Sequence, residues 1–292
     1  MLKGCITAIV TPFFEDGSID YQSLTKFTEW QINSGVSGLV VVGSTGEAAA
    51  LTDSEKLAVI RHVVEVNRGR VPLIVGSGTA ATAMTLEFID EVNQLSGVDY
   101  LMCLVPYYVK PTQNGLYQHF AAVAKHSKFP VILYNVPGRT ACNLADDTVL
   151  RLARDFKNIV AIKDATGDLK RCTYLMAHKP EHFILLSGDD FSAVTFMLSG
   201  GAGVISVASN IRPSQFSQMC AHALAGERDA ALAINKQLLS LYDALFCESN
   251  PIPVKWALCQ EQQIAHGMLR LPLTELSSGY HNRFRDILEQ IK

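Results

Sequence analysis

The sequence lacks the features that mark several large classes of protein. It contains no run of about 18 apolar residues, the length needed for a membrane-spanning helix, and no lysine- and arginine-rich tract that would follow a phosphate backbone. Charged residues make up only 18% of the 292 residues, and 28 acidic against 25 basic side chains leave a net charge of −3. We therefore expect neither a membrane protein nor a nucleic-acid partner.

Paired cysteine motifs and a secretory leader are missing as well. The seven cysteines are odd in number, never follow a CxxC spacing, and lie mostly among apolar neighbours. The first residues contain no basic stretch followed by an apolar core and a small-residue cleavage site. No group of His, Cys, Asp and Glu has the spacing of metal ligands. We expect reduced cysteines, a cytoplasmic location and no bound metal.

Short apolar runs, by contrast, recur eight times. They begin near residues 5, 38, 72, 99, 130, 158, 183 and 203, and each ends in turn-forming or polar residues. Runs that are apolar on both faces suit a parallel sheet covered by helices, and stretches of helical periodicity lie between them. One such stretch opens with Thr52 and Glu55, which predict a capping box. The pattern predicts a (β/α)8 TIM barrel over residues 1–225, with an open doubly wound sheet as the alternative.

The last part of the chain differs from the repeating part. From about Gly226 the pattern is wholly helical, and the segment 250–253 (Asn-Pro-Ile-Pro) separates a helix ending near Cys247 from one starting near Val254. We interpret residues 226–292 as a C-terminal helical domain appended to the barrel.

A lysine ends the sixth apolar run. Lys163 follows four apolar residues, and burial disfavours the ammonium ion and so favours the neutral amine that can attack a carbonyl group. Tyr134 ends the neighbouring run and could shuttle the protons that formation of a Schiff base requires. The structural alternatives are that Lys163 pairs with Asp164 or extends to the surface.

Other strand ends carry groups suited to a small acid. The segment 43–47 (GSTGE) offers two hydroxyl groups between glycines, the segment 106–108 (PYY) offers two tyrosines, and Arg139 could bind a carboxylate. Ordinary turns and tyrosines that cap the core are the alternatives. Together these groups fit a small keto acid, and the chemistry needs no metal or organic cofactor because the lysine itself becomes the electron sink.

Two competing functions are weaker. The glycines at 200–203 could form the phosphate loop of a phosphate-binding barrel, but they precede the eighth run, and Asp189 and Asp190 would repel phosphate. A noncatalytic binding protein would leave Lys163 without a purpose.

Five motifs in order resemble the 4-hydroxy-tetrahydrodipicolinate synthase family, also called dihydrodipicolinate synthases. They are GSTGE, PYY, YNVPGRT, AIKDATG and NPIPVKW, and the resemblance runs almost from end to end. It implies a TIM barrel with a C-terminal helical domain, usually assembled as a homotetramer of two tight dimers. It further implies condensation of pyruvate with L-aspartate 4-semialdehyde in lysine and diaminopimelate synthesis.

The resemblance assigns catalytic roles to four residues. Lys163 matches the lysine that forms the imine with pyruvate, and Tyr134 matches the proton donor and acceptor beside it. Tyr108 matches the residue that reaches across the tight dimer, and with Tyr134 and Ser44 it would form a proton relay. The family usually has threonine at the position of Ser44. Serine keeps the hydroxyl group but loses the methyl group that restricts χ1.

Four further residues correspond to substrate-binding positions. Thr45 matches the residue that binds the carboxylate of pyruvate, and Arg139 matches the residue that receives the carboxylate of the semialdehyde. Gly188 and Ile205 correspond to positions whose backbone lines the pyruvate site. The N-acetylneuraminate lyases and keto-deoxy sugar acid aldolases are the nearest alternative, and they generally lack the arginine at position 139.

The resemblance also bears on regulation. Feedback-inhibited members bind lysine at the tight-dimer interface through polar residues that include a histidine, an asparagine and a glutamate. Those positions here are Lys56, Ala80 and Met84, and only Tyr107 is retained. Because an ammonium group would lose its carboxylate partner and meet a like charge, we expect inhibition by lysine to be weak or absent.

Overall fold

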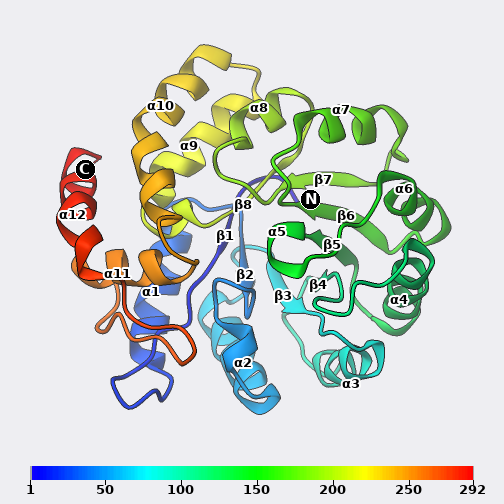
Figure 1. The fold of residues 1–292 in the computed structure, drawn as a ribbon, viewed down its shortest axis with the longest axis horizontal. Helices are drawn as coiled ribbons and strands as arrows, with labels where there is room; N and C mark the ends of the chain where they lie inside the picture. The colour runs from blue at the N-terminus through cyan, green and yellow to red at the C-terminus, as the bar shows by residue number, and fades with distance from the viewer. Residues whose placement is uncertain (1, 292) are drawn as a thin grey trace.

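Eight parallel strands close into a barrel in the computed structural model of the chain, which describes residues 2–291 (Figure 1). Each strand pairs with the next along the chain, and the last pairs with the first. The strands are β1 (Gly4–Ala8), β2 (Gly38–Val41), β3 (Leu73–Ser77), β4 (Tyr100–Leu104), β5 (Val131–Asn135), β6 (Ile159–Asp164), β7 (Ile184–Ser187) and β8 (Gly203–Ser206). The predicted TIM barrel is confirmed.

Helices separate the strands and form the outer layer of the barrel (Figure 1). The main ones are α1 (Tyr21–Asn33), α2 (Asp53–Asn67), α3 (Thr82–Val92), α4 (Gln113–His126), α6 (Asp146–Asp155), α7 (Leu169–His178), α8 (Ala193–Leu198) and α9 (Pro213–Leu224). Helix α2 begins with the predicted capping box, in which Thr52 and Glu55 satisfy each other's backbone N–H groups. A short helix α5 (Pro137–Thr140) and two 3-10 turns, η1 (Ala48–Ala50) and η2 (Ala208–Asn210), lie in the loops after β5, β2 and β8.

The apolar residues form two separate layers, which explains why the strands are apolar on both faces. Side chains such as Ile74, Ile132 and Ile205 fill the interior of the barrel. A larger cluster, which includes Leu133 and Ile162, lies between the strands and the surrounding helices. Alternate residues of one strand therefore belong to different cores, so the position of each residue along a strand decides whether it faces the interior.

The C-terminal segment is less helical than predicted. Helices α10 (Arg228–Leu245), α11 (Ile252–Gln260) and α12 (His281–Gln290) and the 3-10 turn η3 (Ser278–Tyr280) are present, but residues 261–277 form turns and irregular structure. The prediction of a wholly helical segment was wrong there because Gly267 and Pro272 interrupt the helical pattern.

Tertiary contacts stabilise this irregular segment. The guanidinium group of Arg270 donates to the carbonyl groups of Gly17 and Ala50 and pairs with Glu55. These bonds attach the segment to the barrel without a helix. The domain boundary at 225 and 226 stays a prediction.

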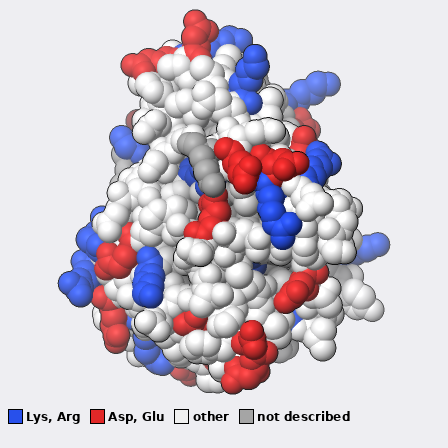
Figure 2. All heavy atoms as spheres, turned by 90° about the vertical axis from the view of Figure 1, so that its left-hand side faces the viewer, with Lys and Arg blue, Asp and Glu red and all other residues white. Residues whose placement is uncertain are grey.

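The surface of the C-terminal side carries charges of both signs. Figure 2 shows acidic and basic side chains interspersed over this face. Among residues 2–291, no helix has both the length and the apolar character that crossing a membrane requires.

Candidate active site

The ends of β5 and β6 bring the two central predicted residues together. Tyr134 is paired with Lys163 across the two strands, and both side chains are more than 90% buried. The Lys163 Nζ lies 4.2 Å from the centroid of the Tyr134 ring. Asp164 does not pair with Lys163; its carboxylate contacts Asn135, Thr166 and Arg171 instead. The lysine therefore lies inside the mouth of the barrel, as the catalytic hypothesis requires.

Gly188 provides space for the lysine. A β-carbon at this position would lie 3.0 Å from Lys163 Cε and 2.8 Å from Ala165 Cβ, closer than ordinary van der Waals contact. Ile205 belongs to the apolar cluster inside the barrel that also contains Tyr134. Both predicted lining residues thus lie in or next to the barrel mouth.

The two predicted carboxylate-binding residues are connected by Asn250. The side-chain amide of Asn250 donates a hydrogen bond of 2.9 Å to Thr45 Oγ1, and its backbone carbonyl accepts a bond of 2.8 Å from the Arg139 guanidinium. Thr45 is buried, whereas Arg139 is exposed at the start of the loop after β5. Asn250 Oδ1 is buried without a hydrogen-bond partner among the described residues. In the sequence, Asn250 stands out only as part of a motif and a helix break, and no local signal reveals these contacts.

The predicted proton relay is not assembled within the described part of one chain. Tyr108 is 85% exposed, and within residues 2–291 neither Tyr108 nor Ser44 makes a side-chain hydrogen bond to Tyr134. The backbone of Tyr108 is left-handed (φ 72°), and the N–H of Val109 donates to the carbonyl of Tyr107 across it. A bulky residue is thus held in an unfavourable backbone conformation with its side chain largely exposed.

A buried ion pair lies behind the loop that carries Ser44 and Thr45. Lys255 of α11 is completely buried, and its Nζ donates to Glu47 Oε1 at 2.7 Å and to the carbonyl of Thr11 at 2.9 Å. Burial lowers the pKa of Lys255 to about 8, although the Glu47 carboxylate opposes this change. The pair ties α11 to the loop after β2. The sequence alone does not reveal this pair, although Glu47 lies in the motif GSTGE and Lys255 in NPIPVKW.

A second buried carboxylate lies beyond β7. Asp190 accepts hydrogen bonds from the N–H groups of Val207 and Ala208, which follow β8. Burial raises the pKa of Asp190 to about 6. Asp190 therefore joins the loop after β7, which contains Gly188, to the loop after β8, the strand that contains Ile205.

Comparison with known proteins places the chain among proteins of one family. Residues 1–291 match the dihydrodipicolinate synthetase family. The chain is 48% identical over 289 residues to the 4-hydroxy-tetrahydrodipicolinate synthase of Laribacter hongkongensis, with 99% of this chain and 98% of that protein covered. It is 46% identical to the corresponding synthase of Coxiella burnetii, with coverage of 100% and 99%.

Solved structures agree with this placement. The chain superposes on the chloride-inhibited dihydrodipicolinate synthase of Acinetobacter baumannii complexed with pyruvate with a TM-score of 0.97, at 44% identity and with 100% and 99% of the two chains covered. A monomeric dihydrodipicolinate synthase variant gives a TM-score of 0.96 at 36% identity, with 99% and 97% covered. The relationship that the five motifs predicted is confirmed, and the chain belongs to the dihydrodipicolinate synthetase family.

Proposed function

We propose that the chain is a 4-hydroxy-tetrahydrodipicolinate synthase that condenses pyruvate with L-aspartate 4-semialdehyde through an imine on Lys163. Membership of the dihydrodipicolinate synthetase family supports this lyase activity. The single observation that carries the mechanism is the buried amine of Lys163, which lies 4.2 Å from the centroid of the Tyr134 ring at the mouth of the barrel. An amine in this position is shielded from water and has a phenol beside it for proton transfer.

The chemistry follows from these two side chains. The neutral amine of Lys163 attacks the keto carbon of pyruvate, and one water molecule leaves as the imine forms. Tyr134 supplies and removes the protons of this step. Loss of a proton from the methyl carbon of the bound pyruvate gives an enamine, which attacks the aldehyde carbon of the semialdehyde. The new carbon–carbon bond forms as the aldehyde oxygen takes up a proton, and the imine to Lys163 is restored. Attack on the imine carbon by water or by the amino group of the bound product then breaks the bond to Lys163 and frees its amine. Lys163 is the electron sink throughout, so the proposal requires no cofactor or metal.

Two carboxylates have to be oriented for this reaction. We assign the pyruvate carboxylate to Thr45 and the semialdehyde carboxylate to Arg139, and the backbone at Gly188 and Ile205 to the wall of the pyruvate site. Asn250 contacts both Thr45 and Arg139, which supports a common placement of the two substrates. The guanidinium group is well suited to a carboxylate because it donates two parallel hydrogen bonds.

The exposed ring of Tyr108 supports an assembled enzyme. In our proposal it enters the site of a second copy in a tight dimer and completes the relay with Ser44 and Tyr134 of that copy. We expect a homotetramer built from two such dimers, in the cytoplasm. Since one similar structure is of a monomeric variant, sedimentation of the purified protein is the measurement that decides its oligomeric state.

The function is tested by pyruvate consumption. Purified protein receives pyruvate with L-aspartate 4-semialdehyde or, separately, with N-acetylmannosamine, and the Lys163→Ala variant serves as the control. Rapid consumption that depends on the semialdehyde and disappears in the variant is expected. Consumption with the amino sugar alone would instead identify a sugar acid lyase of the same superfamily and would leave Arg139 without a function.

A further inference from the structure

Two polar side chains lie directly behind the proposed catalytic pair. Successive residues of a strand face opposite sides, so Asn135 and Asp164, which follow Tyr134 and Lys163, face the helical layer. The preceding residues on that side of both strands are apolar and belong to the outer core. Asn135 is fully buried and Asp164 is 5% exposed. An amide and a carboxylate in this apolar layer require partners, because burial without them costs free energy.

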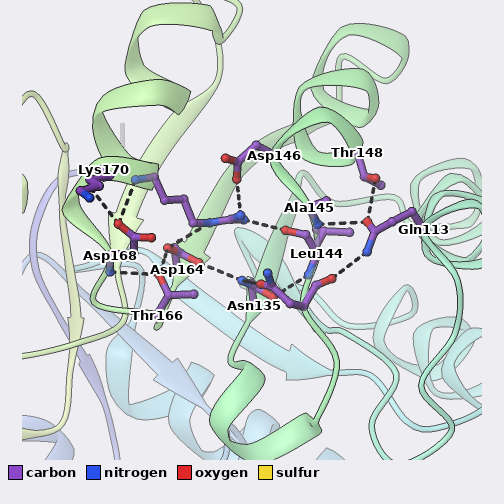
Figure 3. A network of polar contacts seen from close by, with 12 residues as sticks. Gln113, Asn135, Leu144, Ala145, Asp146, Thr148, Asp164, Thr166, Asp168 and Lys170 are labelled. Carbon is purple, nitrogen blue, oxygen red and sulfur yellow. Dashed lines mark hydrogen bonds and ion pairs between the residues drawn. The ribbon is translucent and has the colours of Figure 1, made fainter.

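The partners connect the two strand ends to each other. Asn135 Nδ2 donates to Asp164 Oδ1 at 3.0 Å and to Asn143 Oδ1 at 2.9 Å, and Asn135 Oδ1 accepts from the backbone N–H of Leu144 at 3.0 Å. The other carboxylate oxygen, Asp164 Oδ2, accepts from Thr166 Oγ1 at 2.6 Å. Figure 3 shows these groups converging between the ends of the strands. The side chains thus continue the cross-strand bonding where the sheet ends.

Arg171 of α7 extends the network to the helices. Its Nε lies 3.3 Å from Asp164 Oδ2, its Nη2 donates to the carbonyl of Leu144 at 2.7 Å, and its Nη1 pairs with Asp146. Arg171 is buried, so its charge interacts with both carboxylates in a region from which water is largely excluded. Strand β6 is consequently attached to the start of α6 and to α7.

The position of this network matters because β6 pairs irregularly with β5. Val131 pairs with Ile159, whereas Ile132 pairs with Ala161, so one extra residue of β6 lies between these two pairs. A shift of one residue in a strand turns every later side chain to the opposite face. Beyond the irregularity, such a shift would move the amine of Lys163 out of the barrel and the carboxylate of Asp164 into it.

We propose that Asp164, together with Asn135 and Arg171, is a positioning residue that holds β5 and β6 in the register placing Lys163 against Tyr134. Its side chain faces away from the substrate and acts only through the strand ends. The backbone carbonyl of Asp164 also accepts from the N–H of Gly188 at 2.8 Å, so the same residue aligns the third strand of the site. This inference rests on the proposed function of Lys163 as the imine-forming residue.

The test compares the variants Asp164→Ala and Asp164→Asn with a matched control, Glu261→Ala. Glu261 accepts two bonds of 2.7 Å from Arg212, is partly buried like its partner, and has no assigned part in the site. For each protein the adduct with pyruvate is trapped by borohydride at several pyruvate concentrations and pH values, and the melting temperature is recorded. Trapping reports the reaction of Lys163 directly, whereas melting reports the fold.

Asp164→Ala is expected to lower the trapping rate at saturating pyruvate about 100-fold, because misplacing a reacting group by about 1 Å costs about that factor in rate. The pyruvate concentration that gives half of the maximal rate should change less. Asp164→Asn should recover part of the loss, because its amide oxygen still accepts from Asn135. Glu261→Ala should lose melting temperature but keep the trapping rate. If Asp164→Ala does not fold, Asp164→Asn and Asn135→Ala give the same comparison, with losses in the same direction.

A normal trapping rate in a folded Asp164→Ala variant would overturn the inference, and if that variant does not fold, normal rates in both Asp164→Asn and Asn135→Ala would do so. So would an equal loss of rate in Glu261→Ala, because the effect would then follow stability rather than position. If the wild-type enzyme forms no pyruvate adduct at all, the proposed function itself fails, and that result is distinct from a normal rate in the Asp164 variants.

Discussion

Replacing Gly188 by alanine tests the geometry around the reactive lysine. The new β-carbon would lie 2.8 Å from Ala165 Cβ and 3.0 and 3.1 Å from Cε and Cγ of Lys163, whereas ordinary contacts begin at 3.4 Å. To reach 3.4 Å, the distance to Ala165 Cβ has to grow from 2.8 Å by about 0.6 Å and the distance to Lys163 Cε from 3.0 Å by about 0.4 Å. The lysine side chain is more mobile than the backbone next to Ala165, so Lys163 takes up much of the displacement.

The size of the expected loss follows from this displacement. A shift of about 1 Å costs about 100-fold in rate, so about half that shift should lower kcat about 10-fold, or about 1.4 kcal/mol in the activation free energy. Overpacking should also lower the free energy of unfolding by about 1–3 kcal/mol. The assay is steady-state pyruvate consumption together with borohydride trapping.

A second glycine provides the control. Gly279 lies in η3, and a β-carbon there would meet no described heavy atom within 4 Å, so Gly279→Ala should keep both activity and stability. A folded Gly188→Ala enzyme with wild-type kcat and trapping rate would refute the claim that a β-carbon at position 188 displaces Lys163 from its reactive position.

Three other predictions follow from the site and its surroundings. Ser44→Val, which keeps a branched shape but removes the hydroxyl group, should abolish most turnover in the coupled assay, and near-normal turnover would remove Ser44 from the relay. Lysine at up to low-millimolar concentration should inhibit weakly or not at all, because the ammonium group of Lys56 would repel the ammonium group of the inhibitor. Lys56 Nζ pairs with Asp53 at 2.8 Å and occupies a position where inhibited relatives have a different polar residue. Strong inhibition in a titration would contradict this prediction. The bond from Arg270, together with weaker effects of the bonds from Thr52, lowers the pKa of Glu55 to about 2, so these contacts contribute stability above pH 4.5 that is lost as the pH falls through 2. Allowing for the 30% exposure of the Glu55 side chain, that contribution is about 2 kcal/mol. Chemical denaturation should show that the free energy of unfolding of wild type exceeds that of Glu55→Gln by less and less as the pH falls over this range. A difference that does not change with pH would argue against the pair.

The repeating part of the chain could be predicted closely from its sequence. Seven of the eight strands lie within the apolar runs and β1 begins one residue before its run, because strands buried on both faces leave a clear pattern of short apolar segments bounded by polar turns. The capping box before α2 was equally readable, since both of its residues are close in sequence. Parallel pairing of neighbouring strands then placed Tyr134 beside Lys163.

Contacts between distant segments could not be predicted in this way. Asn250 meets Thr45, and Lys255 meets Glu47, across more than 200 residues, and no local pattern encodes such a contact. The irregular segment 261–277 was missed although Gly267 and Pro272 are local signals against a helix. What the sequence could not show is that bonds from Arg270 to the barrel stabilise this segment in place of helical hydrogen bonds. The roles assigned to the site residues remain predictions that the variants test.

The central claim is that Lys163 is the nucleophile, and the most direct measurement is the position of the trapped pyruvate adduct. The protein is treated with pyruvate and borohydride and then digested, and the masses of its peptides are measured by mass spectrometry. We predict one adduct, on the peptide that contains Lys163, and none in Lys163→Ala. The chain has a second buried lysine, Lys255, whose pKa is lowered to about 8, so Lys255 is the alternative site at which an adduct could form. An adduct on Lys255, or on no lysine at all, would contradict the account.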